Sequence, residues 1–219
     1  NGKVHATAAV ASLTLEGNVD SGTDIAVGGT STMVLGDGSA MTYAGNIDMS
    51  FEAATTTVLD LKAGTVAVTG DIDLSTVGVA VSATIEMAEA SSITGSIIDT
   101  VNATLLTVNV NGSATIGGGT SVFDIATTTA AAIAIDQNMT LTLAGTGAVT
   151  GASATAMVFT LTGTGSVLKV TGAKTITGAI TSGGAGTDGT LDIDADTTIT
   201  GLIGATKLLA ITVADSTAL

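Results

Sequence analysis

The sequence predicts an all-β fold, a parallel β-solenoid of about eight coils of roughly 26 residues each. Three observations support this prediction. The chain is rich in Thr, Val and Ile, whose branched side chains favour strands, and it contains no Pro. A short strand-like run that ends in glycine recurs along the chain. Within that run, apolar residues alternate with small polar ones, as they do on a strand with one buried face.

The recurring run is clearest in the segment Lys174–Gly201, where Thr-Ile-Thr-Gly occurs twice and ends at Gly178 and at Gly201. Earlier copies of the run end at Gly17, Gly45, Gly70, Gly95, Gly117 and Gly145. Seven intervals separate Gly17 from Gly201, so the mean spacing is about 26 residues, within the range of about 20–30 that is typical of solenoid coils. Eight coils stacked about 4.8 Å apart would form a rod about 38 Å long.

The position two residues before the glycine is apolar in the clear copies of the run, which predicts a column of inward-facing side chains. Its members are Leu15, Tyr43, Val68, Ile93, Leu143, Ile176 and Ile199. The residues on either side are small and mostly hydroxylated, so we expect them to face outward. We expect the glycine to allow a corner with positive φ. The absence of Pro suits a fold in which nearly every strand N–H bonds to the next coil.

Further strands are expected between these runs, and only Ala83–Ala90 has a helical pattern. The expected strands are Ser31–Leu35, Thr57–Leu61, Val77–Ile85, Leu105–Val110, Val122–Ile125, Ala131–Ile135, Ala156–Leu161, Val167–Val170 and Leu208–Val213. No linker divides the chain, so a single domain over residues 1–219 is predicted. A β-sandwich of seven or eight strands is the alternative fold, although it would not require regularly spaced copies of one run.

Composition excludes several classes of function. The net charge of −14, from 19 acidic residues against five lysines, argues against binding to nucleic acid or to anionic membrane surfaces. No apolar run approaches the length of about 20 residues that a membrane-spanning helix needs. The chain has no Cys, which excludes disulfides and thiolate metal sites. It begins at Asn1 rather than Met, so we expect that a secretory leader was removed; a fragment of a longer protein is the alternative.

Acidic and amide side chains follow three of the glycines in what looks like one register. They are Asn18 and Asp20, Asn46 and Asp48, and Asp71 and Asp73. On neighbouring coils these side chains would stack about 4.8 Å apart, where repulsion between carboxylates favours a counter-ion. Ca²⁺ takes carboxylate and amide oxygens, so calcium between the coils is predicted. The alternative is a solvated acidic stripe in which Asn and Asp form turns.

A second acidic group is Asp192, Asp194 and Asp196, which alternate with apolar or small residues. On a strand, these three side chains would face one side about 6.7 Å apart. We expect that they could share a calcium ion with the turn at residues 188–189.

No residue pattern supports catalysis, and we expect no enzymatic activity. The single histidine, His5, lies near the terminus, where a solvated residue is expected. The glycine-rich stretches Gly117–Gly119 and Gly183–Gly186 lack the following Lys of a phosphate-binding loop. The four aromatic residues are too scattered to line a sugar-binding cleft.

The Thr-x-Thr pairs Thr175/Thr177 and Thr198/Thr200 resemble the ice-binding face of β-solenoid antifreeze proteins. The other copies of the run match that pattern only in part. The resemblance implies binding to ice or to a polysaccharide. The alternative is that Thr is simply a suitable surface residue for a strand.

Both ends of the chain are strand-like and lack a polar cap. Neither Val10–Leu15 nor the segment from Lys207 to Leu219 carries an amphipathic helix or a charge cluster. Uncovered β edges pair readily with other chains, so we expect copies of this chain to stack head to tail. The alternative is that neighbouring coils of a longer solenoid cover these ends.

The recurrent phrases G-[ND]-[IV]-D and T-I-T-G, together with the acidic, Cys-free composition rich in Thr, Gly and Ala, resemble repetitive bacterial surface proteins. The similar proteins are the passenger domains of autotransporters and adhesins, and some S-layer-like proteins. The resemblance implies an extracellular, non-enzymatic role. The leading expectation is a secreted subunit that stacks end to end into a surface filament, sheath or matrix fibre. An adhesin segment that binds a host or surface ligand is the second expectation, and binding of ice or a polysaccharide is the third.

Overall fold

The computed structural model confirms the parallel β-solenoid. It describes residues 4–6, 12–19, 24–27, 31–49, 56–75, 82–99, 105–117, 121–125, 130–151, 153, 155–184 and 188–215. All the regular elements in these ranges are strands, and all their pairings are parallel. The β-sandwich alternative is therefore wrong, because its sheets are antiparallel.

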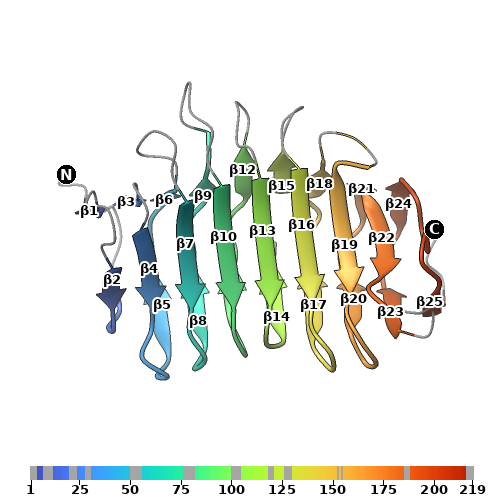
Figure 1. Cartoon of the computed structure of the whole chain (residues 1–219), viewed down its shortest axis with the longest axis horizontal. Helices are drawn as coiled ribbons and strands as arrows, with labels where there is room; N and C mark the ends of the chain where they lie inside the picture. The colour runs from blue at the N-terminus through green and yellow to red at the C-terminus, as the bar shows by residue number, and fades with distance from the viewer. Residues whose placement is uncertain are drawn as a thin grey trace.

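The strands form three sheets that run side by side along the length of the rod (Figure 1). Sheet A consists of β1 (Val4–Ala6), β3 (Ile25–Val27), β6 (Ile47–Asp48), β9 (Ile72–Asp73), β12 (Ile97–Asp99), β15 (Ser121–Ile125), β18 (Ala148–Thr150), β21 (Lys174–Thr177) and β24 (Thr197–Thr200). Sheet B consists of β2 (Ser12–Leu15), β4 (Ser31–Leu35), β7 (Thr56–Leu61), β10 (Ser82–Met87), β13 (Leu105–Val110), β16 (Ala130–Ile135), β19 (Met157–Leu161) and β22 (Ala179–Ser182). Sheet C consists of β5 (Met41–Tyr43), β8 (Val66–Val68), β11 (Ser92–Ile93), β14 (Ala114–Ile116), β17 (Thr140–Leu143), β20 (Val167–Val170), β23 (Asp188–Ile193) and β25 (Leu208–Val213).

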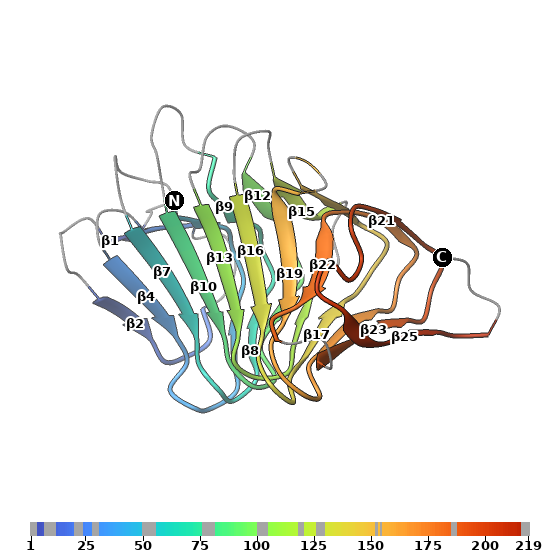
Figure 2. The ribbon, with the colours of Figure 1, turned by 45° about the vertical axis from the view of Figure 1, so that its right-hand side comes forward.

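Each turn of the chain visits sheet A, then sheet B, then sheet C, as the two views in Figures 1 and 2 show. The seven turns from β3 to β23 contribute one strand to every sheet. At the N-terminal end, Val19 takes the sheet C position through a single parallel bridge to Tyr43. At the C-terminal end, Ile203 takes the sheet B position through a bridge to Ile180. With these two bridges included, each sheet has nine positions along the rod.

Every sheet contributes at least one apolar column to the core, and the members of this column are paired in register from the first described turn to the last. The sheet A column is Val4, Ile25, Ile47, Ile72, Ile97, Phe123, Val149, Ile176 and Ile199. The sheet B column is Leu13, Met33, Leu59, Ile85, Val108, Ile133, Phe159, Ile180 and Ile203. The sheet C column is Val19, Tyr43, Val68, Ile93, Ile116, Leu143, Val170, Ile193 and Val213. The seven interior members of each column are at most 1% exposed, so these columns form the core.

The column expected from the sequence is wrong in its register, because its members belong to three different sheets. Tyr43, Val68, Ile93 and Leu143 lie in the sheet C column as expected. Leu15, however, pairs with Leu35 in sheet B. The Thr-Ile-Thr-Gly copies place Ile176 and Ile199 in sheet A. A strand that ends in glycine occurs at more than one kind of corner, so the phrase alone does not identify a position in the turn.

Two further expectations need correction. Residues 83–90 are not helical, because β10 pairs along its whole length with β7 and β13. In sheet A, only β15, β21 and β24 were expected as strands, since its other strands are two or three residues long. The 25-residue spacing of Ile47, Ile72 and Ile97 is the sequence signal that could have revealed these short strands.

The corner glycines have two different roles. Gly145 has φ of +67°, as predicted for a corner residue. Gly70 and Gly95 are needed for a different reason, because a Cβ atom at Gly70 would overlap the carbonyl oxygen of Gly45, and one at Gly95 would overlap that of Gly70. These corners are therefore packed backbone against backbone between neighbouring turns.

Candidate functional site

Asp24, Asn46 and Asp71 form a side-chain ladder at the corner where each turn enters sheet A. The Asn46 N–H donates to Asp24 Oδ1 at 3.1 Å, and the Asp71 N–H donates to Asn46 Oδ1 at 3.0 Å. The Ser96 N–H then donates to Asp71 Oδ1 at 2.7 Å. One oxygen of each side chain thus satisfies a backbone donor of the next turn, which is a structural role for these residues.

Asp48 and Asp73 lie beside this ladder and are paired in register on β6 and β9, as predicted. With Ile98 and the three ladder residues they line a pocket of about 160 Å³. We call the five polar residues Asp24, Asn46, Asp48, Asp71 and Asp73 the acidic corner. Within the described ranges, however, no three or more His, Cys, Asp or Glu side chains are arranged to hold a metal ion. Calcium at the acidic corner stays a prediction.

The first turn does not follow the predicted alignment. Ala26, not Asp20, pairs with Asp48, and Asp20 itself lies outside the described residues. Asn18 lies at a different corner, where its Oδ1 accepts the Thr42 N–H at 2.9 Å. The N-V-D phrase after Gly17 therefore leads into sheet C rather than sheet A.

Asp192 and Asp194 are paired with a lysine of the preceding turn. Lys169 Nζ lies 2.7 Å from Asp192 Oδ2 and 2.5 Å from Asp194 Oδ2. The Thr212 hydroxyl donates to Asp192 Oδ1 at 2.6 Å. The hydrogen bond from Lys169 lowers the pKa of Asp192, and the bonds to Asp192 and Asp194 raise the pKa of Lys169. Lys169 thus pairs with two of the three carboxylates of this group, and calcium binding here stays a prediction.

Asp196 lies beyond β23, which ends at Ile193. It lies just before β24, where its backbone carbonyl accepts the Lys174 N–H at 3.0 Å. The alternation in the sequence thus extends past the end of the strand.

Five threonines lie in register on the outer face of sheet A in its last three turns. Thr175 pairs with Thr198, Thr177 pairs with Thr200, and Thr150 pairs with Thr177. We call these residues the threonine patch. The predicted Thr-x-Thr face is thus limited to one end of one sheet, and binding to ice or polysaccharide stays a prediction.

The C-terminal end of the rod exposes large apolar side chains, two of which continue buried positions of the core. Four of the five large hydrophobic side chains that are exposed in the described ranges lie there, namely Leu202 (59%), Leu209 (56%), Ile211 (46%) and Val213 (41%). Ile211 and Val213 pair in register with residues 191 and 193 of β23, which are fully buried. They are exposed because no described turn covers them.

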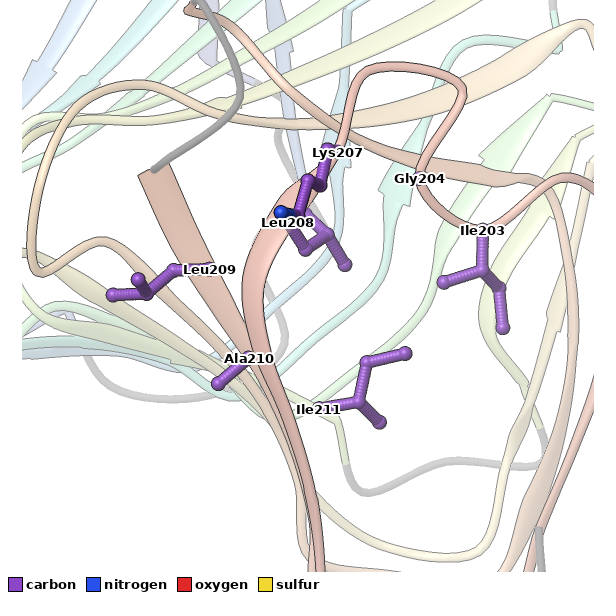
Figure 3. Close-up of a pocket in the computed structure, with 7 residues that line it drawn as sticks. All are labelled: Ile203, Gly204, Lys207, Leu208, Leu209, Ala210 and Ile211. Atoms are coloured by element: carbon purple, nitrogen blue, oxygen red, sulfur yellow. The ribbon is translucent and has the colours of Figure 1, made fainter.

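Leu209 and Ile211 line a groove of about 460 Å³ together with Ile203 and Leu208. Figure 3 shows Ile203 on one side of the groove, with Leu208 and Ile211 projecting toward it from β25, while Leu209 projects from the other side of the strand. β25 is the last strand of sheet C, so one of its edges has no neighbouring strand among the described residues. An apolar groove beside a free strand edge is a site where another β-strand can be added. We call Leu202, Ile203, Leu209, Ile211 and Val213 the open end.

Sequence reasoning missed two buried charged residues, Asp99 and Lys174. Lys174 is only 7% exposed. Its Nζ donates to the carbonyl oxygens of Leu143 at 3.1 Å and of Ala144 at 2.9 Å. Burial lowers the pKa of Lys174 to about 8. Its position two residues before Ile176, on the inward side of the strand, was the signal that could have identified it.

The fold and the site together define the chain as a parallel β-solenoid with an open apolar end. No protein-family model, curated protein or solved structure matches the chain. Across the described ranges there is no helix of the length and hydrophobicity that crossing a bilayer requires.

Proposed function

We propose that the chain is a non-enzymatic structural subunit that assembles end to end with copies of itself into an extracellular filament, sheath or fibre. The observation that carries this proposal is the open end, where core-type residues and a free strand edge face outward together. An extracellular location rests on composition and on the resemblance to surface proteins.

The open end alone does not supply enough energy for stable association. Covering four side chains that are about half exposed contributes roughly 3–6 kcal/mol, whereas association costs about 4–15 kcal/mol. The contact must therefore also include backbone hydrogen bonds of the edge strands and apolar residues of the partner. A second copy of the same three-sheet cross-section supplies both.

The charge of the chain favours contacts at the ends over contacts along the sides. The net charge is −14, and outward-facing acids such as Asp60 and Glu86 lie on the sides of the rod. Like charges oppose the lateral approach of two rods. End-to-end growth is consequently the favoured mode.

The test is sedimentation velocity with negative-stain electron microscopy over a range of protein concentrations. We expect wild-type fibres with an axial repeat of about 43 Å, since nine strand positions are spaced about 4.8 Å apart. Ile211→Asp should abolish the fibres. Leu105→Asp is the matched control, because Leu105 is also exposed (39%) but lies on the side of the rod in β13. A wild-type chain that stays monomeric at all concentrations would overturn the proposal, as would equal loss of fibres in both variants.

The second candidate is an adhesive segment of a longer surface protein. The observation in its favour is that further turns of the same chain would cover the open end equally well. That role predicts short monodisperse rods in the same experiment, whereas a filament subunit polymerises.

A further inference from the structure

We propose that the contact between copies is head to tail and in register, so that all three core columns run on from one copy into the next. In this arrangement Ile199, Ile203 and Val213 of one copy lie next to Val4, Leu13 and Val19, respectively, of the following copy. This inference rests on the proposed function and specifies the surface that each copy presents.

The first support is that the three core columns reach both ends of the described rod. Each column is aliphatic at both ends, and every step within it pairs the same register position of adjacent turns. Leu13, Val19, Ile199 and Ile203 are only partly buried although they pack against the core. Each of these residues therefore has a free face directed along the rod axis, where an interior residue would meet the next turn.

The second support is the order in which the chain visits the three sheets at the two ends of the rod. The described strands enter in sheet A with β1 and leave in sheet C with β25. The strand that follows β25 in this screw would belong to sheet A, and β1 of a second copy is such a strand. The described strands of the two copies thus follow one another in the same order of sheets. A tail-to-tail contact would instead place strands antiparallel and would close at a dimer.

The third support is that the two ends complement each other in shape. Among the described residues, sheet C is represented at the N-terminal end by Val19 alone, but the open end presents the six residues of β25. In sheet B the relation is reversed, because Ile203 stands alone at the open end while β2 has four residues. In the head-to-tail contact, each single-residue segment lies opposite a full strand.

The fourth support is charge complementarity. Glu16 directly follows β2, and Lys207 directly precedes β25, so both lie at the corner between sheets B and C, at opposite ends of the rod. Both side chains are exposed. In the head-to-tail register these opposite charges lie on neighbouring turns.

The test uses engineered cysteines, because the chain has none of its own. Ser12 and Leu202 are exposed and lie one residue before Leu13 and Ile203, so they occupy equivalent positions on sheet B. Residues paired across adjacent strands are about 4.8 Å apart, within the Cα separation of about 4.4–6.8 Å that disulfides span. The double variant Ser12→Cys/Leu202→Cys should give a ladder of covalent multimers on oxidation. A mixture of the single variants Ser12→Cys and Leu202→Cys should give only disulfide dimers that contain one copy of each variant.

The outcomes separate this inference from the proposed function. Disulfide dimers of Leu202→Cys alone would show a tail-to-tail contact, which overturns the inference but not assembly. Equal linkage of Ser12→Cys to Thr198→Cys, an exposed position on sheet A, would overturn the register. A wild-type chain that never assembles would overturn both proposals. If the reduced double variant fails to assemble, the pair His5→Cys/Thr200→Cys tests the same register on sheet A.

Discussion

The interior turns and the last turn have the same core chemistry but very different exposure. Ile193 is fully buried, whereas Val213, which pairs with it in the last turn, is 41% exposed. Leu191 and Ile211 differ in the same way, at 0% and 46%. The difference comes from the lack of a covering turn among the described residues and not from residue type. The open end therefore has the residue types of the core but not its burial.

The sharpest test of this comparison is truncation of a core residue at each place. Phe159 is fully buried and its ring meets Phe123 edge to face, with centroids 6.2 Å apart. Phe159→Ala should lower the free energy of unfolding by about 3–5 kcal/mol because it leaves a cavity. Ile211→Ala should cost the monomer less than about 1 kcal/mol, since half of its surface is already in water. Urea unfolding, at a protein concentration too low for assembly, measures the free energy of unfolding of both variants. Equal losses of stability would contradict the difference between the interior and the open end.

Replacing a corner glycine should likewise have a larger effect in the interior turns than in the first turn. A Cβ atom at Gly70 meets backbone of the neighbouring turn, whereas one at Gly17 has nothing within 4 Å. Gly70→Ala should therefore destabilise the fold by about 2–4 kcal/mol. Gly17→Ala is the matched control and should stay within about 0.5 kcal/mol of wild type. Thermal unfolding of the two variants measures these changes in stability. A Gly70→Ala variant that is as stable as wild type would show that the corner can relax, and would contradict the prediction.

Lys174 tests whether the interior tolerates a charge. Burial lowers its pKa to about 8, so between about pH 8 and its ordinary value near 10.4 the unfolded chain holds a proton that the folded chain has lost. Stability should therefore rise with pH across that window, and the penalty should be fully present below pH 8. Lys174→Met should abolish the rise and add about 1–2 kcal/mol at pH 7, since it removes the buried charge but also two hydrogen bonds.

The measurement is urea unfolding at intervals from pH 7 to 9.5. This range stays below the titration of Tyr43, whose pKa burial raises to about 12. A wild-type profile that is flat over the window would contradict the prediction.

The acidic corner allows a test of charge repulsion on the outer surface of the interior turns. Asp48 and Asp73 are stacked in register, and like charges on adjacent strands are destabilising. In chelator, Asp73→Asn should raise stability by about 0.5–1 kcal/mol. Added calcium should stabilise wild type more than this variant if the predicted ion binds. Asp124→Asn is the control, because Asp124 lies on the same sheet but pairs with Ile98 and Thr150 rather than with an acid, so its loss should give no gain.

Much of the fold was predictable, because the strands of sheet B and the last strands of sheet C are long enough to show alternation. The expected strands Ser31–Leu35, Leu105–Val110 and Leu208–Val213 coincide with β4, β13 and β25. Most of sheet A was not predictable in this way, since a strand such as Ile47–Asp48 is too short to show a period. Its outward Asp is also typical of a turn.

The candidate sites were predictable only where the register between turns could be inferred. Asp48 and Asp73 were correctly aligned because a turn of 25 residues separates them. The ion pairs of Lys169 with Asp192 and Asp194 were not predictable, because the residues meet only once their turns are stacked. Free edges at the ends were expected from the lack of caps. The groove beside Ile203 depends on how the last turn passes through sheet B.

The smallest expected effect concerns the charged side chains at the two ends of the rod. Glu16→Lys and Lys207→Glu should each raise the concentration needed for assembly about two- to threefold, because each places like charges across the proposed contact. The double variant restores opposite charges and should assemble like wild type. In about 0.5 M salt the differences should shrink, since exposed charges are screened. Sedimentation across a concentration series measures all four proteins, with unfolding curves to show that monomer stability is unchanged. If the double variant assembles as weakly as the two single changes combined, Glu16 and Lys207 do not face each other. The open end would then be covered in some other register.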